Sequence, residues 1–148
     1  MDNEMTLSFM AISDNEALAR IAITSFISVL DPTIEELSEI KTVVSEAVTN
    51  AIIHGYDENP NGIVTVQASR QGREVTISIL DQGIGIENVT KAMEPLYTTK
   101  PMLERSGMGF TIMESFTDQL AVQSELGKGT AVTFKKQFQP VEEPLYVR

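Results

Sequence analysis

Two polar side chains, four positions apart in an otherwise apolar segment, are the first residues of this 148-residue sequence that could do chemistry. Glu46 and Asn50 share one face if the segment is helical, because residues four apart are neighbours on an α-helix. A carboxylate can take a proton from an attacking hydroxyl, and an amide oxygen suits Mg²⁺, which prefers oxygen ligands. The alternative is a solvated polar stripe, although the neighbouring residues are apolar, namely Val43, Ala47 and Ile53.

A second carboxylate, Asp81, stands where a predicted strand ends and a glycine-rich loop begins. A fixed carboxylate there can accept a hydrogen bond from the exocyclic amine of adenine. Guanine presents a carbonyl at that position, so two acceptors would face each other. Gly83 and Gly85 would let the backbone approach the base closely. On its own, the motif is equally typical of an ordinary strand-to-loop turn.

A third motif precedes a predicted helix and is expected to bind phosphate, because backbone N–H groups at the start of a helix attract anions. Its candidate residues are Ser106, Gly107, Met108, Gly109 and Phe110. Just before it, Arg105 could offset the charge on the transferred phosphoryl group. The alternative for this arginine is a surface ion pair with Glu104 or Glu94.

The remaining candidates extend the site at its two ends. Thr98, Thr99 and Lys100 lie in a predicted lid and could add a second cation and hydroxyl groups beside the phosphates. Thr130, which follows Gly127-Lys128-Gly129, could share the adenine with Asp81 through a water. A plain hairpin threonine is the alternative. The single histidine, His54, is interpreted as a helix-end residue rather than a phosphoacceptor.

A particular set of helices and strands is needed to bring these candidate residues together. Alternation predicts strands at about 6–11, 63–69, 74–80, 120–124 and 131–137. Helical spacing predicts helices from Asp14 or Asn15 to about Leu30, from Thr33 to about Ile53, and over 109–116. For the first helix the predicted buried stripe is Leu18, Ile21, Ala22, Phe26 and Val29. Thr33 and Glu36 have the capping-box pattern. Residues 83–106 show little periodicity and are predicted to be a lid.

This order of elements predicts an α+β fold, a two-layer sandwich with helices on one face of the sheet. One domain is expected over residues 1–137, followed by a flexible tail over 138–148. A net charge of −10 argues against a nucleic-acid partner and favours a partner with a basic surface. The absence of cysteine excludes disulfides and thiolate sites. With no signal-like start or long apolar run, we expect a cytoplasmic protein without a membrane segment.

Taken in order, the four motifs resemble the N, G1, G2 and G3 boxes of the ATPase fold shared by gyrase, Hsp90, histidine kinases and MutL, the GHKL or Bergerat fold. They are Glu46–Asn50, Asp81–Gly85, Gly107–Phe110 and Gly127–Thr130. The resemblance implies a mixed, mostly antiparallel sheet and an ATP or ADP site with Mg²⁺. It assigns Glu46 as the base and Asn50 as the metal ligand.

Within that superfamily the chain resembles the stand-alone anti-sigma factors with serine-kinase activity, especially those of sporulation. The resemblance implies a homodimer that inhibits a sigma factor of the sigma-F type and phosphorylates a serine on an anti-anti-sigma factor. Glu16 and Arg20, on the polar side of the first predicted helix, are candidates for partner binding. The alternative for them is a solvated ion pair.

Three rival functions are left by the sequence. One is the equivalent serine kinase of the general stress pathway, which has the same motifs. Another is an ATP-sensing binding module without catalysis. The third, the ATPase core of a histidine kinase or topoisomerase, is disfavoured because the sequence has no room for a dimerisation helix pair or a transducer domain.

Overall fold

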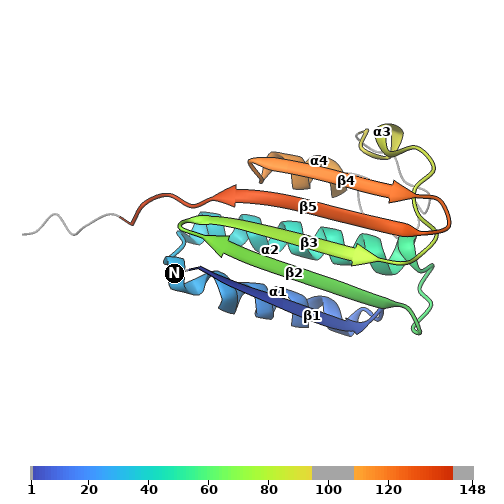
Figure 1. Ribbon diagram of the computed structural model, residues 1–148, viewed down its shortest axis with the longest axis horizontal. Helices are drawn as coiled ribbons and strands as arrows, with labels where there is room; N and C mark the ends of the chain where they lie inside the picture. The colour runs from blue at the N-terminus through green and yellow to red at the C-terminus, as the bar shows by residue number, and fades with distance from the viewer. Residues whose placement is uncertain (1, 95–108, 142–148) are drawn as a thin grey trace, which may run out of the picture.

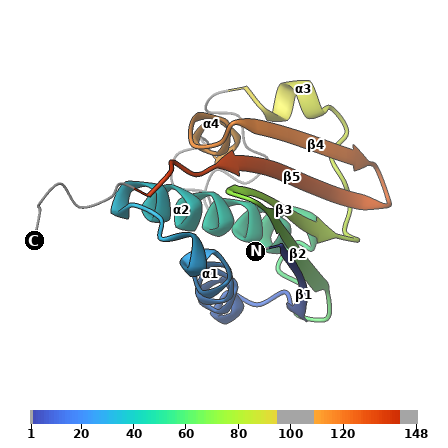
Figure 2. The ribbon, with the colours of Figure 1, turned by 60° about the vertical axis from the view of Figure 1, so that its left-hand side comes forward.

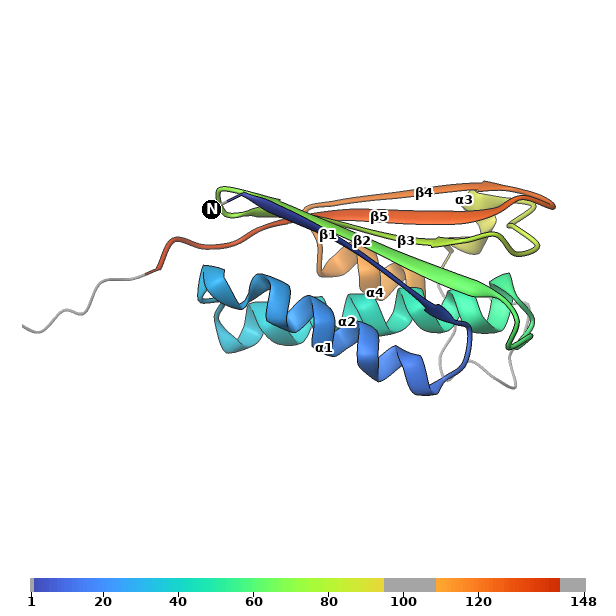
Figure 3. The same cartoon turned by 60° about the horizontal axis from the view of Figure 1, so that its bottom comes forward.

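The computed structural model describes residues 2–94 and 109–141, and within them a sheet and a helical layer lie face to face (Figures 1 and 3). The strands are β1 (Asn3–Met10), β2 (Ile63–Gln71), β3 (Glu74–Asp81), β4 (Gln119–Glu125) and β5 (Gly129–Gln137). The helices are α1 (Asp14–Ile27), α2 (Ile34–Asn50), α3 (Val89–Ala92) and α4 (Gly109–Ser115). The predicted α+β two-layer fold is confirmed.

The sheet has the order β1-β2-β3-β5-β4, and all four pairings are antiparallel. Because β3 pairs with β5, the end of β3 meets the start of β5, where Asp81 lies opposite Thr130. On the neighbouring pair Ser124 of β4 lies opposite Thr130. The topology therefore brings residues that are far apart in sequence to one end of the sheet.

Helix α2 lies in the middle of the helical layer, between α1 and α4 (Figure 2). It begins with the predicted capping box, in which the backbone N–H of Glu36 donates to Thr33 Oγ1 at 3.0 Å. The backbone N–H of Thr33 donates in turn to Glu36 Oε1 at 2.9 Å. Apolar residues of α2 that are buried against the sheet include Ile40, Val44 and Val48.

The predicted buried stripe of α1 is wrong in phase except at Phe26, which is buried as predicted. The residues that are buried are Ala19, Ile23, Phe26, Ile27 and, in the short 3₁₀ turn Ser28–Leu30, Leu30. Leu18, Ile21 and Val29 are exposed, by 43%, 68% and 55%. The segment is apolar on most sides, so two phases fit a helical period equally well. Contacts with the sheet and with α2 select one of them, which sequence spacing cannot do.

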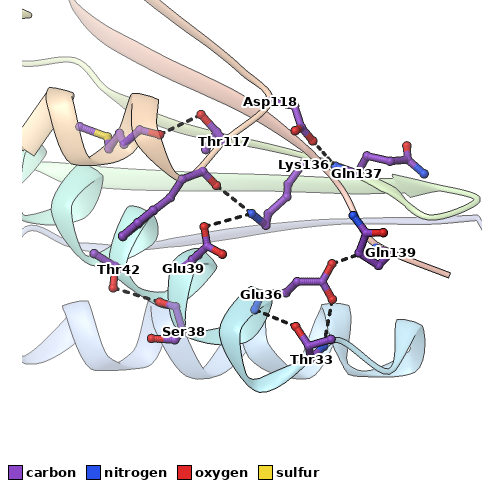
Figure 4. A network of polar contacts seen from close by, with 12 residues as sticks. Thr33, Glu36, Ser38, Glu39, Thr42, Thr117, Asp118, Lys136, Gln137 and Gln139 are labelled. Carbon is purple, nitrogen blue, oxygen red and sulfur yellow. Dashed lines mark hydrogen bonds and ion pairs between the residues drawn. The ribbon is translucent and has the colours of Figure 1, made fainter. Parts of the chain in front are cut away.

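The chain stays packed two residues beyond the predicted domain end at Gln137. Phe138 is buried, with 1% of its surface exposed, and the backbone N–H of Gln139 donates to Glu36 Oε2 at 2.9 Å (Figure 4). Arg73 reaches the same strand end, because its Nε donates to the carbonyl oxygen of Gln139 at 2.9 Å. This network fastens the chain after β5 to the start of α2.

Within the predicted lid the structure adds α3, a short helix that the sequence did not predict. Asn88 caps it, with its Oδ1 accepting a hydrogen bond of 3.0 Å from the backbone N–H of Lys91. Among the helices that the structure describes, none has both the length and the apolar character needed to span a bilayer.

Candidate functional site

A cavity of about 720 Å³ opens between α2, the loop after β3, α3, α4 and the turn between β4 and β5. Six of the predicted site residues line it, namely Asn50, Asp81, Gly85, Gly109, Phe110 and Thr130. Glu46 and Gly83 are not among the lining residues but adjoin them. The structure thus brings members of all four motifs to one place.

At one end of the cavity, α4 starts directly against the polar side of α2. A Cβ atom on Gly109 would lie 3.1 Å from Glu46 Oε2 and 3.3 Å from Asn50 Nδ2. Asn50 Oδ1 is buried and accepts no hydrogen bond from any residue within the described ranges. Since a buried polar atom is normally satisfied, an unsatisfied amide oxygen here fits a hard cation or the water bound to it. The predicted pairing of carboxylate and amide is therefore compatible with Mg²⁺.

At the other end of the cavity, Asp81 is held in a defined position. Only 9% of its surface is exposed, and the backbone N–H of Gly83 donates to its Oδ1 at 2.9 Å. Burial raises the pKa of the Asp81 carboxyl above its ordinary value, while the backbone N–H groups of Gly83 and Thr130 act in the opposite direction. A carboxylate that is buried and only partly satisfied is suited to accept a hydrogen bond from a ligand.

Gly55 is a site residue that sequence reasoning missed. Helix α2 continues into a π-helical turn, Ala51–Gly55, which ends with Gly55 against the Asp81 side chain. A Cβ at this position would lie 2.8 Å from Asp81 Cγ. The carbonyl oxygen of Gly55 also accepts a hydrogen bond of 2.8 Å from the backbone N–H of Ile84, in the glycine loop. His54, in the same turn, lines the cavity beside it.

The glycine loop after β3 is in direct contact with two other segments. A Cβ on Gly83 would lie only 1.8 Å from the carbonyl oxygen of Gly55, so no larger residue fits. The backbone N–H of Gly127, in the turn between β4 and β5, donates to the carbonyl oxygen of Ile84 at 2.7 Å. The first and third glycine motifs therefore form one continuous wall.

Thr130 is placed on that wall by its neighbours in the sheet. Its Oγ1 lies 2.8 Å from Ser124 Oγ, across the β4–β5 pair. Ser124 was not predicted as a site residue. The alternation in β4 carries the signal, because Leu120, Val122 and Ser124 point to the same inner face.

The two candidates for partner binding form an ion pair on α1. The distance between Arg20 Nε and Glu16 Oε1 is 3.0 Å, with 42% of the arginine side chain and 19% of the glutamate side chain exposed. Glu16 Oε1 also accepts a hydrogen bond from Ser45 Oγ of α2. The pair is therefore linked to the residue that directly precedes Glu46.

Seven predicted site residues lie outside the described residues. They are Thr98, Thr99, Lys100, Arg105, Ser106, Gly107 and Met108. Their roles at the phosphates stay predictions.

Comparison with known proteins agrees with this geometry. A family model for the histidine kinase-like ATPase domain matches residues 11–136. An anti-sigma F factor of Lysinibacillus sphaericus is 66% identical over 141 residues, which cover 95% of this chain and 97% of that protein. The chain belongs to the anti-sigma F factor family. Another member, from Clostridium acetobutylicum, is 59% identical over 143 residues, or 97% of this chain and 99% of its own length.

Two solved structures share the fold of this family member at low sequence identity. The RsbU and RsbW domains of a Mycobacterium tuberculosis protein superpose with a TM-score of 0.67 and 17% identity, over 92% of this chain and 32% of that one. The catalytic domain of the histidine kinase ThkA superposes with a TM-score of 0.56 and 16% identity, over 93% and 99% of the two chains. These likenesses bear on the fold alone.

Proposed function

We propose that the protein is an ATP-dependent anti-sigma factor that also acts as a protein serine kinase. It would inhibit a sigma factor of the sigma-F type and phosphorylate a serine on the anti-anti-sigma factor that opposes it. The observation that carries the proposal is one cavity lined by Asn50 and Gly109, beside Glu46, and by Asp81 and Thr130. The names of the relatives supply the class of partner.

Each end of the cavity has a distinct task in this proposal. Asp81 accepts a hydrogen bond from the exocyclic amine of adenine, and Thr130 supports it. Asn50 Oδ1 would hold Mg²⁺, which when bound neutralises charge on the phosphates. Arg105, Lys100 and the second glycine motif are proposed to bind the phosphates.

The transfer step needs a base next to the attacking serine. Glu46 takes the proton from the serine hydroxyl of the protein substrate as its oxygen bonds to the γ-phosphorus. The bond from the γ-phosphorus to the bridging oxygen breaks, so the products are phosphoserine, ADP and a protonated Glu46. Helix α2 supplies Glu46, which is half-buried beside the start of α4.

The Glu16–Arg20 pair is proposed as part of the docking surface. Ser45 links this pair to α2, whereas Glu46, the next residue, faces the start of α4, so a partner bound at the pair contacts the helix that carries the proposed base from its other side. The charge of −10 favours a partner that presents basic side chains. The functional unit is proposed to be a homodimer.

The test is a phosphotransfer assay with labelled ATP, the purified chain and a purified anti-anti-sigma protein. Glu46→Gln is expected to bind ATP and the sigma factor normally and to lose phosphotransfer by at least 100-fold, since general-base catalysis contributes about 10²–10⁴-fold. Glu35→Gln is the matched control, because Glu35 is an exposed carboxylate on the same helix. Glu46 is not the base if its variant keeps the normal rate. A wild-type chain that binds both partners and ATP without transfer would be a non-catalytic ATP sensor.

A further inference from the structure

One hydroxyl at the adenine end of the cavity takes part in three hydrogen bonds. Ser124 Oγ donates to the carbonyl oxygen of Gly129 at 3.0 Å. It accepts a hydrogen bond of 2.7 Å from the backbone N–H of Ile86, at the start of the lid. It also lies 2.8 Å from Thr130 Oγ1, with which it shares a third bond. One partner, Ile86, comes from the predicted lid, and the other two, Gly129 and Thr130, are the first residues of β5.

Either hydroxyl could donate the third bond, but only one direction lets all three bonds form together. A serine hydroxyl has one hydrogen and two acceptor lone pairs. A carbonyl oxygen can only accept, so the hydrogen of Ser124 points to Gly129. A backbone N–H can only donate, so one lone pair of Ser124 is used by Ile86. With all three bonds made, the bond to Thr130 uses the second lone pair, and Thr130 is its donor.

This direction determines what Thr130 can offer to a ligand. Its hydroxyl hydrogen is held by Ser124, so its oxygen presents only lone pairs to the cavity that it lines. Asp81, paired with Thr130 across β3 and β5, is also an acceptor. A water that donates its two hydrogens to these two side chains would in turn present a lone pair. Directly or through one water, this wall accepts hydrogen bonds and does not donate them.

We propose that Ser124 is a positioning residue that makes the site selective for adenine by fixing Thr130 as an acceptor. The proposal rests on the proposed nucleotide site and adds a residue to it. An exocyclic amine finds an acceptor on this wall, whereas the carbonyl of guanine finds no donor. A site whose polar groups are fixed discriminates more strongly than one whose hydroxyl can rotate, because the wrong ligand leaves buried groups unpaired.

The experiment compares ADP and GDP binding to the full chain by titration calorimetry, with magnesium present. In Ser124→Ala the Thr130 hydroxyl is free to turn its hydrogen toward a guanine carbonyl. The ratio of ADP to GDP affinity is expected to fall about tenfold, or ~1.4 kcal/mol of discrimination. Ser124→Thr keeps the hydroxyl and is expected to keep the ratio of the wild type. Ser28→Ala, which removes an exposed hydroxyl from the 3₁₀ turn after α1, is the control.

A double-mutant cycle separates this role from a merely structural one. In a Thr130→Val background there is no hydroxyl to orient, so adding Ser124→Ala is expected to leave the ADP to GDP ratio unchanged. The proposal is overturned if Ser124→Ala weakens the binding of ADP and GDP equally. It is also overturned if Ser124→Ala lowers the ADP to GDP ratio by the same factor in the Thr130→Val background. If Ser124→Ala does not fold, Ser124→Cys fills the same space with a poorer acceptor and is expected to lower the ratio. A wild-type chain that binds neither nucleotide would instead refute the proposed function.

Discussion

Gly55→Ala is expected to impair nucleotide binding more than it impairs folding. The added Cβ would lie 2.8–3.0 Å from the three atoms of the Asp81 carboxyl group, where ordinary contact begins at 3.4 Å. The carboxyl group must move by roughly half an ångström or more. Because it ends a short side chain, rotation relieves the contact most easily, at an overpacking cost of about 1–3 kcal/mol. That rotation turns the carboxyl away from the N–H of Gly83 and from the cavity.

The loss of affinity follows from the bond that Asp81 is proposed to make. A hydrogen bond to a charged group contributes about 1.5–3 kcal/mol, so its loss lowers ADP affinity by roughly 10- to 100-fold. Titration calorimetry with ADP and magnesium measures the affinity, and urea unfolding measures the stability. Gly72→Ala is the matched control. Its φ of +58° strains an alanine, yet a Cβ there meets no atom within 4 Å. It is expected to lose about 1–2 kcal/mol of stability and no affinity. Unchanged ADP affinity in a folded Gly55→Ala variant would refute this account of Asp81.

Two further predictions concern carboxylates. Burial raises the pKa of Asp81, and only the ionised form is a pure acceptor, so ADP affinity is expected to fall as the pH drops through that raised pKa. Calorimetry over a pH series measures this, and Asp81→Asn should bind weakly without the same pH dependence. For Glu36, burial opposes ionisation, but hydrogen bonds from Thr33 and Gln139 and the charge of Lys136 lower its pKa overall. Because the pKa of Glu36 is lower in the folded chain than in the unfolded chain, the ionised carboxylate stabilises the fold. This stabilisation is present above the ordinary pKa of glutamate and is lost as the pH falls through the pKa of the folded state. Glu36→Ala is expected to lower the free energy of unfolding, measured with urea, by about 1–2 kcal/mol at neutral pH and by less at acid pH. An equal loss at both pH values would contradict this assignment.

The sequence predicted the elements well where local signals agree with each other. Strand alternation, the capping box at Thr33 and the turn glycines specified the hairpins and α2, because each depends on neighbouring residues. The phase of α1 was wrong because an apolar segment needs its packing partners to select the buried side. The motifs also located one cavity, since four weak signals in a fixed order are much more specific than any one alone.

The residues that were missed act through contacts between distant segments. Gly55 becomes important only when β3 brings Asp81 beside it, and Ser124 only when β5 brings Thr130 opposite it. The π-helical turn that ends α2 is also invisible in the sequence, because its residues fit an α-helical pattern equally well. It is recognised by a hydrogen bond that spans five residues, from the backbone N–H of Tyr56 to the carbonyl oxygen of Ala51 at 3.0 Å.

Helix α2 and its π-helical turn connect the proposed docking pair, base, metal ligand and adenine end. Ser45 holds the docking pair through Glu16, Glu46 follows it, and Asn50 is one turn further along. The turn then ends with Gly55 against Asp81. From Glu46 to Gly55 the rise along the axis is roughly 10–13 Å, and a hydrogen-bonded helix holds that separation constant. The proposed base lies on this element and the proposed purine-binding carboxylate lies against its end, so the two can act on a single ligand that spans them. The capping box and the contact of Glu36 with Gln139 hold the start of this helix, and the bond between Glu16 and Ser45 links its middle to α1.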